Sequence, residues 1–310
     1  MEGPSGGYAK ALLFVSLCLI WGTTWLAIKV GLDDLPPFLS AAIRMMIAAG
    51  LLFFWKWLRG ISREGGQREP HGFLFLLSFF WITLPYGFVY WGEQYVSSGL
   101  SAVLFATMPF YVATMGHFWL PGEELTARKA AGLLVGFLGV LVIFLEGTGS
   151  PAVGDIRGII VLLLSPLAAS ISSILAKRRI ASLHPVASNA WVMAYGAIFL
   201  FLGSLLFESD QTARFSGRAI FTLFYLGIIG TALAFSVYLY LLKAETALKM
   251  SLIAYITPVI ALFVGWLVRD EVISLEIAAG SVLVFLGVHL VTRRGHVSRN
   301  GSKEVSSSYG

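Results

Sequence analysis

The chain has 310 residues, of which 57% are hydrophobic and only 13% are charged, and its formal net charge is +5. Soluble domains carry about 25% charged residues, so this composition excludes a water-soluble globular protein and indicates a chain surrounded mostly by lipid. The single cysteine, Cys18, excludes a disulfide within the chain.

Apolar stretches that are long enough to cross a bilayer recur along the whole chain. A membrane helix needs about 20 mostly apolar residues. The qualifying stretches are roughly 10–30, 37–58, 72–95, 99–120, 127–146, 156–176, 185–207, 218–242, 247–268 and 274–292. The first continues too far past Ile20 for a signal peptide, and the short joints leave no room for a soluble domain. We therefore predict an all-α integral membrane protein with ten transmembrane helices.

Positive charges collect on one side of this predicted topology. With a cytoplasmic N-terminus, 16 of the 22 Lys and Arg residues fall in cytoplasmic segments, 5 fall in outer segments, and Arg44 falls within a span. Such a bias is typical of the cytoplasmic side. We expect a multi-pass protein of the inner (plasma) membrane with both termini cytoplasmic. The basic tail is expected to contact anionic lipid, without a nucleic-acid role.

The sequence repeats itself at an interval of about 148 residues. The matched pairs are Pro109 with Pro258, Glu124 with Glu271, Gly132 with Gly280, Gly139 with Gly287 and, more weakly, Lys29 with Lys177 and Pro37 with Pro185. We predict two five-helix repeats, over 1–149 and 150–293, and a polar cytoplasmic tail over 294–310. Because five is odd, the repeats must insert in opposite orientations. Inverted repeats are typical of secondary transporters, with the substrate site at their interface.

Several motifs in a fixed order resemble the drug/metabolite transporter superfamily, in its ten-span EamA branch. They are IWGTTWLAIKVG (20–31), PPFLSAAIRMMIAAG (36–50), YWGEQYVSSGLSAVLFATMPF (90–110), the P-G-E-E-L-T turn (121–126) and the repeated Pro, acidic and Gly series. The resemblance covers about residues 10–293. It implies a ten-helix bundle with cytoplasmic termini that exports small metabolites, amino acids or toxic organic compounds by alternating access. Val192 stands where the second repeat would match Arg44.

Four prolines near the centres of their spans are candidate hinges: Pro85, Pro109, Pro166 and Pro258. Proline removes a backbone donor, and in lipid the freed carbonyl must be buried or line a cavity. We expect a cavity walled by spans 1, 3, 4, 6, 8 and 9, with spans 5 and 10 outside it as scaffold. The alternative interpretation is that these prolines only shape helix packing.

Aromatic and hydroxyl side chains are expected to line this cavity, which would suit amphipathic organic substrates. The candidates are Trp21, Thr24, Tyr86, Tyr90, Tyr238 and Tyr255. Tyr86 and Tyr90 share one helical face because they are four residues apart. The alternative interpretation is ordinary packing between helices, with the threonine bonded to its own helix.

Arg44 and Glu93 are predicted to form the polar centre of the substrate site. A charge within a span costs about 2.5–3.5 kcal/mol or more, so it is a functional candidate. Neither is repeated, since Val192 and Leu242 stand at the matching positions. Arg44 would hold a substrate carboxylate, and Glu93 would bind an amine or carry a coupling proton. The alternative is a buried ion pair that only fixes spans 2 and 3.

The sequence favours a secondary-active transporter of small molecules over two other classes. It contains no ATP-binding motif, metal-ligand spacing or nucleophile–base set. We therefore expect no cofactor, no metal and no enzymatic activity. A lipid-handling flippase stays as the alternative, with an intramembrane enzyme less favoured. The substrate, the coupling ion and the oligomeric state are left open.

Overall fold

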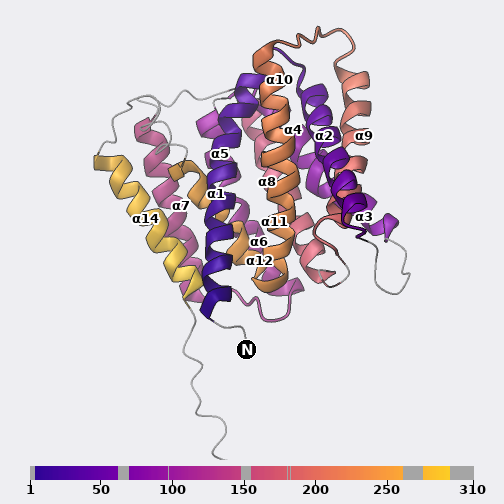
Figure 1. Ribbon diagram of the computed structural model, residues 1–310. Helices are drawn as coiled ribbons and strands as arrows, with labels where there is room; N and C mark the ends of the chain where they lie inside the picture. Colours follow the sequence, from indigo (N-terminus) through magenta and orange to yellow (C-terminus); the bar gives the residue numbers. More distant parts are fainter. Residues whose placement is uncertain are drawn as a thin grey trace, which may run out of the picture.

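The chain forms a bundle of helices in a computed structural model (Figure 1), which describes residues 4–61, 70–96, 98–147, 155–179, 181, 183–260 and 275–293. None of the described residues forms a strand. The predicted all-α membrane fold is thereby confirmed. Glu271 and the predicted tail over 294–310 lie outside the described residues.

The described helices follow the predicted spans in chain order. Up to residue 147 they are α1 (Pro4–Leu32), α2 (Pro37–Leu58), α3 (His71–Ser78), η2 (Phe79–Thr83), α4 (Leu84–Gly92), α5 (Ser98–Phe105), α6 (Met108–Trp119) and α7 (Ala127–Gly147). From residue 156 they are α8 (Ile156–Arg178), α9 (Ala187–Phe207), α10 (Gly217–Phe224), η4 (Tyr225–Leu233), α11 (Ala234–Ala244), α12 (Ala247–Ser251) and α14 (Leu275–Thr292), with a further helical run over 253–260.

Eight described helical stretches, counted across their short interruptions, are long and apolar enough to cross a membrane. Two shorter apolar stretches, Ala247–Ile260 and Ala278–Thr292, lie at the predicted ninth and tenth spans. Residues 261–274 lie outside the described part, so the count of ten helices stays a prediction.

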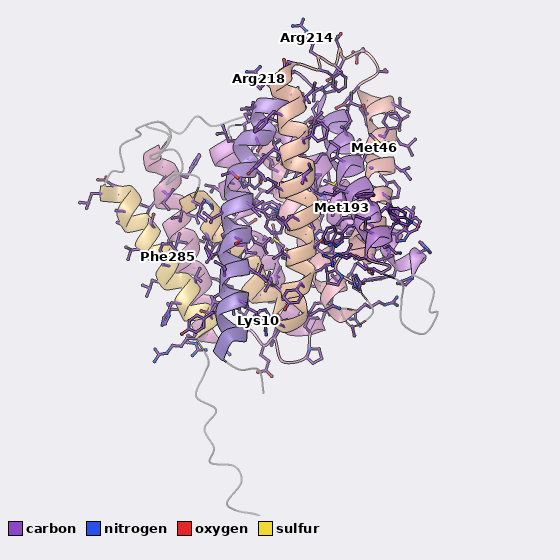
Figure 2. All side chains as sticks on the ribbon, viewed as in Figure 1. Lys10, Met46, Met193, Arg214, Arg218 and Phe285 are labelled. Carbon is purple, nitrogen blue, oxygen red and sulfur yellow. The ribbon has the colours of Figure 1, made fainter. Side chains whose placement is uncertain are left out.

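The two ends of the bundle are easily identified. The start of α1 and the end of α14 lie at one end, and the start of α10 lies at the other (Figure 1). Figure 2 places Lys10 at the first end and Arg214 and Arg218 at the second, so we call these the Lys10 end and the Arg218 end. This arrangement fits an even number of membrane crossings.

Two spans contain π-helical segments at their centres. η2 interrupts the third span and η4 interrupts the eighth, so the same irregularity occurs in both halves of the chain. π-Helical turns inside α-helices frequently mark functional sites. The fourth span is also broken, at residues 106–107 between α5 and α6.

Helix ends are satisfied partly by distant carboxylates. Glu208, which follows α9, accepts hydrogen bonds from two backbone N–H groups at the start of α2, at 2.7 and 3.0 Å. Glu123, which follows α6, accepts from two N–H groups at the start of α12, at 2.8 and 3.1 Å. A negative charge is favourable at a helix N-terminus, where the first N–H groups lack intrahelical acceptors. Each carboxylate therefore joins helices that are more than 120 residues apart.

Helices α7 and α14 pack backbone to backbone through the repeated glycines. A Cβ atom on Gly132 would lie 2.9 Å from the carbonyl oxygen of Gly287, and one on Gly280 would lie 2.9 Å from that of Gly139. The repeat relates these two contacts to each other, because Gly132 matches Gly280 and Gly287 matches Gly139, as expected from two inverted copies. Small residues allow such close approach in membranes.

Gly139→Ala tests this contact. The added methyl group would meet backbone atoms of α14, including the carbonyl oxygen of Gly280 at 2.5 Å. Overpacking typically costs about 1–3 kcal/mol, so the thermal unfolding temperature of the purified protein should fall. The matched control is Gly50→Ala, where the new methyl group meets nothing within 4 Å. Equal stability of the two variants would contradict the close contact.

A polar cluster at the Arg218 end joins Asp34, which follows α1, to the start of α10. Ser216 Oγ donates to Asp34 Oδ2 at 2.6 Å, and Arg218 Nη2 lies 3.3 Å from the same oxygen. The hydrogen bond from Ser216, and next the guanidinium of Arg218, hold the pKa of the Asp34 carboxyl below its ordinary value. The stabilisation is therefore present above the unfolded-state pKa and is lost as the pH falls through the folded-state pKa.

Asp34→Asn should consequently lower the unfolding temperature at pH 7, and the difference from wild type should shrink as the pH is lowered from 7 through the folded-state pKa, which lies below the ordinary aspartate value. The control is Asp33→Asn, because the Asp33 side chain is 58% exposed and its ion pair with Arg218 is 3.6 Å long. Thermal unfolding across this pH range is the measurement. A pH-independent difference for Asp34→Asn would contradict the assignment.

Candidate functional site

A central cavity of about 130 Å³ lies between the helices. Its lining comes from spans 1, 3, 4, 6, 8 and 9, together with Arg44 from α2. Among the described residues, α7, α9 and α14 contribute nothing to it. The six walls match those expected from the sequence, and spans 5 and 10 lie outside as expected.

Aromatic rings form one side of the cavity. Trp21 packs against Phe235 and Tyr238 with ring centroids 5.4 and 5.7 Å apart. Trp81 packs against the same two rings at 5.5 and 5.7 Å. Tyr86 lies beside Phe235 at 6.3 Å. Spans 1, 3 and 8 therefore supply a continuous wall that suits an apolar or aromatic group on a ligand.

Arg44 is the one charged side chain in the cavity lining, and it is only 1% exposed. Its Nε donates to Thr231 Oγ1 at 2.7 Å, Nη1 to the Tyr90 hydroxyl at 3.3 Å and Nη2 to the Gly230 carbonyl at 3.3 Å. The guanidinium also lies 4.8 Å from the centre of the Tyr86 ring. A guanidinium has five N–H donors. One hydrogen on each terminal nitrogen therefore has no acceptor among the described residues.

The π-helical segment η4 supplies two of these acceptors. Gly230 O accepts from both Arg44 and Trp21 Nε1, the latter at 3.2 Å. Thr231 Oγ1 accepts from Arg44 and donates to the Leu226 carbonyl five residues earlier. A side chain on Gly230 would lie 3.0 Å from Thr24 and 3.4 Å from Arg44, so glycine permits the close approach.

Glu93 lies just beyond the end of α4 and is fully buried, outside the cavity lining. Neither carboxylate oxygen has a hydrogen-bond partner. Lys29 donates instead to the main-chain carbonyl of Glu93. Arg44 and Glu93 therefore do not form the ion pair that was the structural alternative for them.

The other predicted site residues divide between cavity and scaffold. Thr24 and Tyr238 line the cavity, where Thr24 donates to the Trp21 carbonyl at 2.8 Å and the Tyr238 hydroxyl lies 2.8 Å from Ser173 Oγ. Tyr90 lies outside the cavity lining, and its hydroxyl accepts a hydrogen bond from Arg44. Tyr255 lies outside the lining, and its hydroxyl donates to the Leu133 carbonyl on α7 at 2.9 Å.

The four predicted hinge prolines are all buried. Pro85 is the second residue of α4, which directly follows η2, and it lines the cavity. Pro109 begins α6 just after the break in span 4, and Pro258 lies in the helical run over 253–260. Pro166 lies within the unbroken α8. Their burial places them inside the bundle, and hinge motion at these positions stays a prediction.

Sequence reasoning missed Trp81, Gly230 and Thr231. Trp81, Pro85 and Val89 recur at helical spacing and all line the cavity, so this face of span 3 was a usable signal. The G-I-I-G-T run over 227–231 also carried a signal, since closely spaced glycines favour helix contact. Among the described residues, no group of three His, Cys, Asp or Glu side chains could hold a metal ion.

A second hollow lies on the side of the bundle, between α9 and α4 and beside α2 and α8. Its lining contains Thr83 and otherwise only apolar residues, with no charged side chain. Arg44 does not contribute to this lateral groove, which is separate from the central cavity.

A solved crystal structure has the same fold. It matches with a TM-score of 0.75 and covers 92% of this chain and 96% of that chain. The sequence identity is 21%, so this likeness concerns the fold alone.

Relatives with similar sequences include proteins described as uncharacterized transporters. The Bacillus subtilis uncharacterized transporter YoaV is 31% identical over 279 residues, covering 90% of this chain and 94% of the relative. Salmonella typhimurium protein PagO is 29% identical, with 89% of each chain covered. The Escherichia coli uncharacterized inner membrane transporter YedA is 26% identical, with 89% and 88% covered.

The EamA-like transporter family matches residues 9–145 and again residues 156–293, nearly the whole chain. Together with the apolar helices, this match identifies a multi-pass membrane transporter rather than an enzyme. The chain belongs to the EamA-like transporter family, consistent with the drug/metabolite transporter superfamily.

Proposed function

We propose that this transporter exports small amphipathic metabolites that carry a carboxylate, such as amino acids and related compounds. It does so by alternating access through the central cavity, as a secondary-active carrier. We place it in the inner (plasma) membrane with both termini cytoplasmic. The 16-to-5 distribution of cations supports this orientation. The Lys10 end is then cytoplasmic, and the Arg218 end faces outward.

The observation that carries the proposal is the state of Arg44. Its hydrogen bonds to Thr231, Tyr90 and Gly230 leave one hydrogen on each terminal nitrogen, and the residue lines the cavity. Two parallel N–H groups match the two oxygens of a carboxylate. The hydrogen bonds of Arg44 go to neutral oxygens, so among the described residues its positive charge has no hydrogen-bonded carboxylate, and the charge of Glu93 acts on it without a direct contact. An anionic substrate group would supply that partner.

The aromatic wall supports an apolar body on the same substrate. Trp21, Trp81, Phe235 and Tyr238 face a cavity that also receives Arg44. A ligand with a carboxylate at one end and an apolar or aromatic group at the other would match both features. A flippase is less well supported, since the lateral groove has no charged lining residue for a lipid head group.

Glu93 supports coupling to protons. The carboxyl is fully buried and its oxygens have no hydrogen-bond partner. A buried charge without hydrogen bonds is costly even beside the charges of Lys29 and Arg44, so binding a proton would stabilise this arrangement. The Tyr90 hydroxyl accepts a hydrogen bond from Arg44, and Tyr90 lies three residues before Glu93. Arg44 and Glu93 are therefore separated by about one turn of this helix. Release of the proton from Glu93 would then accompany a change of conformation.

Arg44→Gln should lower the uptake of a carboxylate-bearing substrate into proteoliposomes at least tenfold, equivalent to about 1.4 kcal/mol. The substrate is first identified by screening the wild type against amino acids and organic cations. The Arg59→Gln control lies at the end of the same helix, where the guanidinium stacks on Trp55, 4.8 Å from the ring centre. Undiminished transport by well-folded Arg44→Gln would rule out the proposed site.

Glu93→Gln should remove the dependence of net transport on a pH gradient, while exchange of substrate across the membrane without a gradient continues. The amide keeps the shape of the side chain but cannot carry a proton. The measurement compares accumulation with and without an imposed pH difference, using wild type treated with a proton ionophore as the reference. Accumulation that still follows the pH gradient in Glu93→Gln would contradict proton coupling through this residue.

A further inference from the structure

Lys29 joins the first span to the end of the third. Its Nζ donates to the main-chain carbonyl of Glu93 and to that of Val96, the latter at 3.2 Å. These carbonyls follow α4, where a helix has no intrahelical donors left for its last C=O groups. The ammonium also faces the negative end of the helix dipole, which is favourable.

Lys177 makes the same contact in the second half of the chain. Its Nζ donates to the main-chain carbonyls of Leu242 and Glu245, both at 2.6 Å, at the end of α11. Lys177 lies 148 residues after Lys29, and its two acceptors lie 149 residues after the acceptors of Lys29. The sixth span is thus joined to the end of the eighth as the first is joined to the third. We call the two contacts the Lys29 clamp and the Lys177 clamp.

The clamps lie at opposite ends of the bundle. Helix α8 begins beside the Lys29 clamp, because the Asp155 N–H donates to the Tyr95 carbonyl at 3.4 Å, next to Val96. The same helix reaches the Lys177 clamp 22 residues later. At 1.5 Å per residue this separation is about 33 Å, close to the thickness of the hydrocarbon core.

Each clamp lies about one turn beyond the cavity. Ile28 and Val89 line the cavity next to the Lys29 clamp. Tyr238 lines the cavity on the side of the Lys177 clamp, four residues before Leu242, and its hydroxyl is hydrogen-bonded to Ser173. The clamped helices are therefore cavity walls, so a change in either contact alters one entrance.

We propose that Lys29 and Lys177 are the two gate residues of the transport cycle. Release of the Lys29 clamp separates spans 1 and 3 and opens the cavity to the outer side. Release of the Lys177 clamp separates spans 6 and 8 and opens it to the cytoplasm. This inference rests on the proposed alternating access and adds the residues that perform it. Both clamps are engaged in this structure, which corresponds to a cavity held at both ends.

The chemistry of the contacts suits a reversible gate. Lysine is a flexible point charge with three donors, and its partners here are main-chain carbonyls rather than carboxylates. Glu245 directs its side chain elsewhere, to Lys249 at 2.9 Å. The hydrogen bonds of each clamp therefore go to carbonyls, while Glu93 acts on Lys29, and Glu123 and Glu245 act on Lys177, only electrostatically.

The test measures from which side the cavity is accessible. The Cys18→Ala background removes the only cysteine of the chain, and Ala254→Cys places a reporter thiol on the cavity wall. A membrane-impermeant maleimide is then applied to right-side-out and inside-out vesicles. Lys29→Met should raise the labelling rate from the outer side at least fivefold, and Lys177→Met should raise it to the same extent from the cytoplasmic side. Lys→Arg at either position should restore the original rates.

Lys249→Met is the matched control, because Lys249 lies near the Lys177 clamp but pairs with a side chain. Unchanged labelling in both clamp variants, or a change toward the same side in both, would overturn the proposal. If a methionine variant fails to fold, Lys→Gln replaces it, since a neutral amide weakens the contact without removing every donor. The Gln variant should give a smaller change toward the same side, and a loss of thermal stability without that change would overturn the gate role.

The outcome is separable from that of the proposed function, because labelling requires no substrate. Opposite changes in accessibility, without transport of any carboxylate-bearing compound by the wild type, would support the gates and contradict the substrate class. Normal transport by variants with unchanged accessibility would contradict the gates and leave the proposed function standing.

Discussion

The guanidinium of Arg44 is buried among helices whose surroundings are hydrocarbon, and much of the interior is arranged to satisfy it. Water is not there to solvate the charge, so protein oxygens must do so. A hydroxyl from span 3 and two oxygens from η4 take this role. The π-helical geometry of η4 and the missing side chain of Gly230 follow from the same need, because both bring oxygens close to Arg44. The cavity forms where this polar group meets the aromatic wall.

Much of the architecture could be predicted because membranes impose simple rules. Length and apolar composition located the helices, and the interval of about 148 residues singled out the glycines through which α7 and α14 pack in the structure. Arg44 was identifiable because a charge within a span is costly. The walls of the cavity followed from the repeat, since equivalent spans of two inverted halves must face a common interface.

Other features depend on which side chains meet in three dimensions, and a sequence pattern gives a helical face without its neighbour. Tyr255 looked like a cavity residue, but the face that carries it turns toward α7. Glu93 was paired with Arg44 by depth alone, whereas Lys29 is the cation that lies beside it. The acceptor carbonyl of Gly230 was unpredictable in principle, because every residue has a carbonyl and only the local π-helical geometry exposes this one.

The carboxylate of Glu208 at the start of α2 has a consequence for how the protein is made. The helix enters the membrane well before residue 208 has been synthesised, so the first amide groups of α2 have no access to their carboxylate acceptor at that stage. Two of the hydrogen-bond acceptors of Arg44, Gly230 and Thr231, are synthesised later still. During biosynthesis, therefore, the early spans hold polar groups that only the later spans can satisfy. A ribosome that stops midway leaves a half-bundle carrying an unpaired charge, which is the kind of intermediate that insertion factors and quality-control proteases recognise by its exposed polarity.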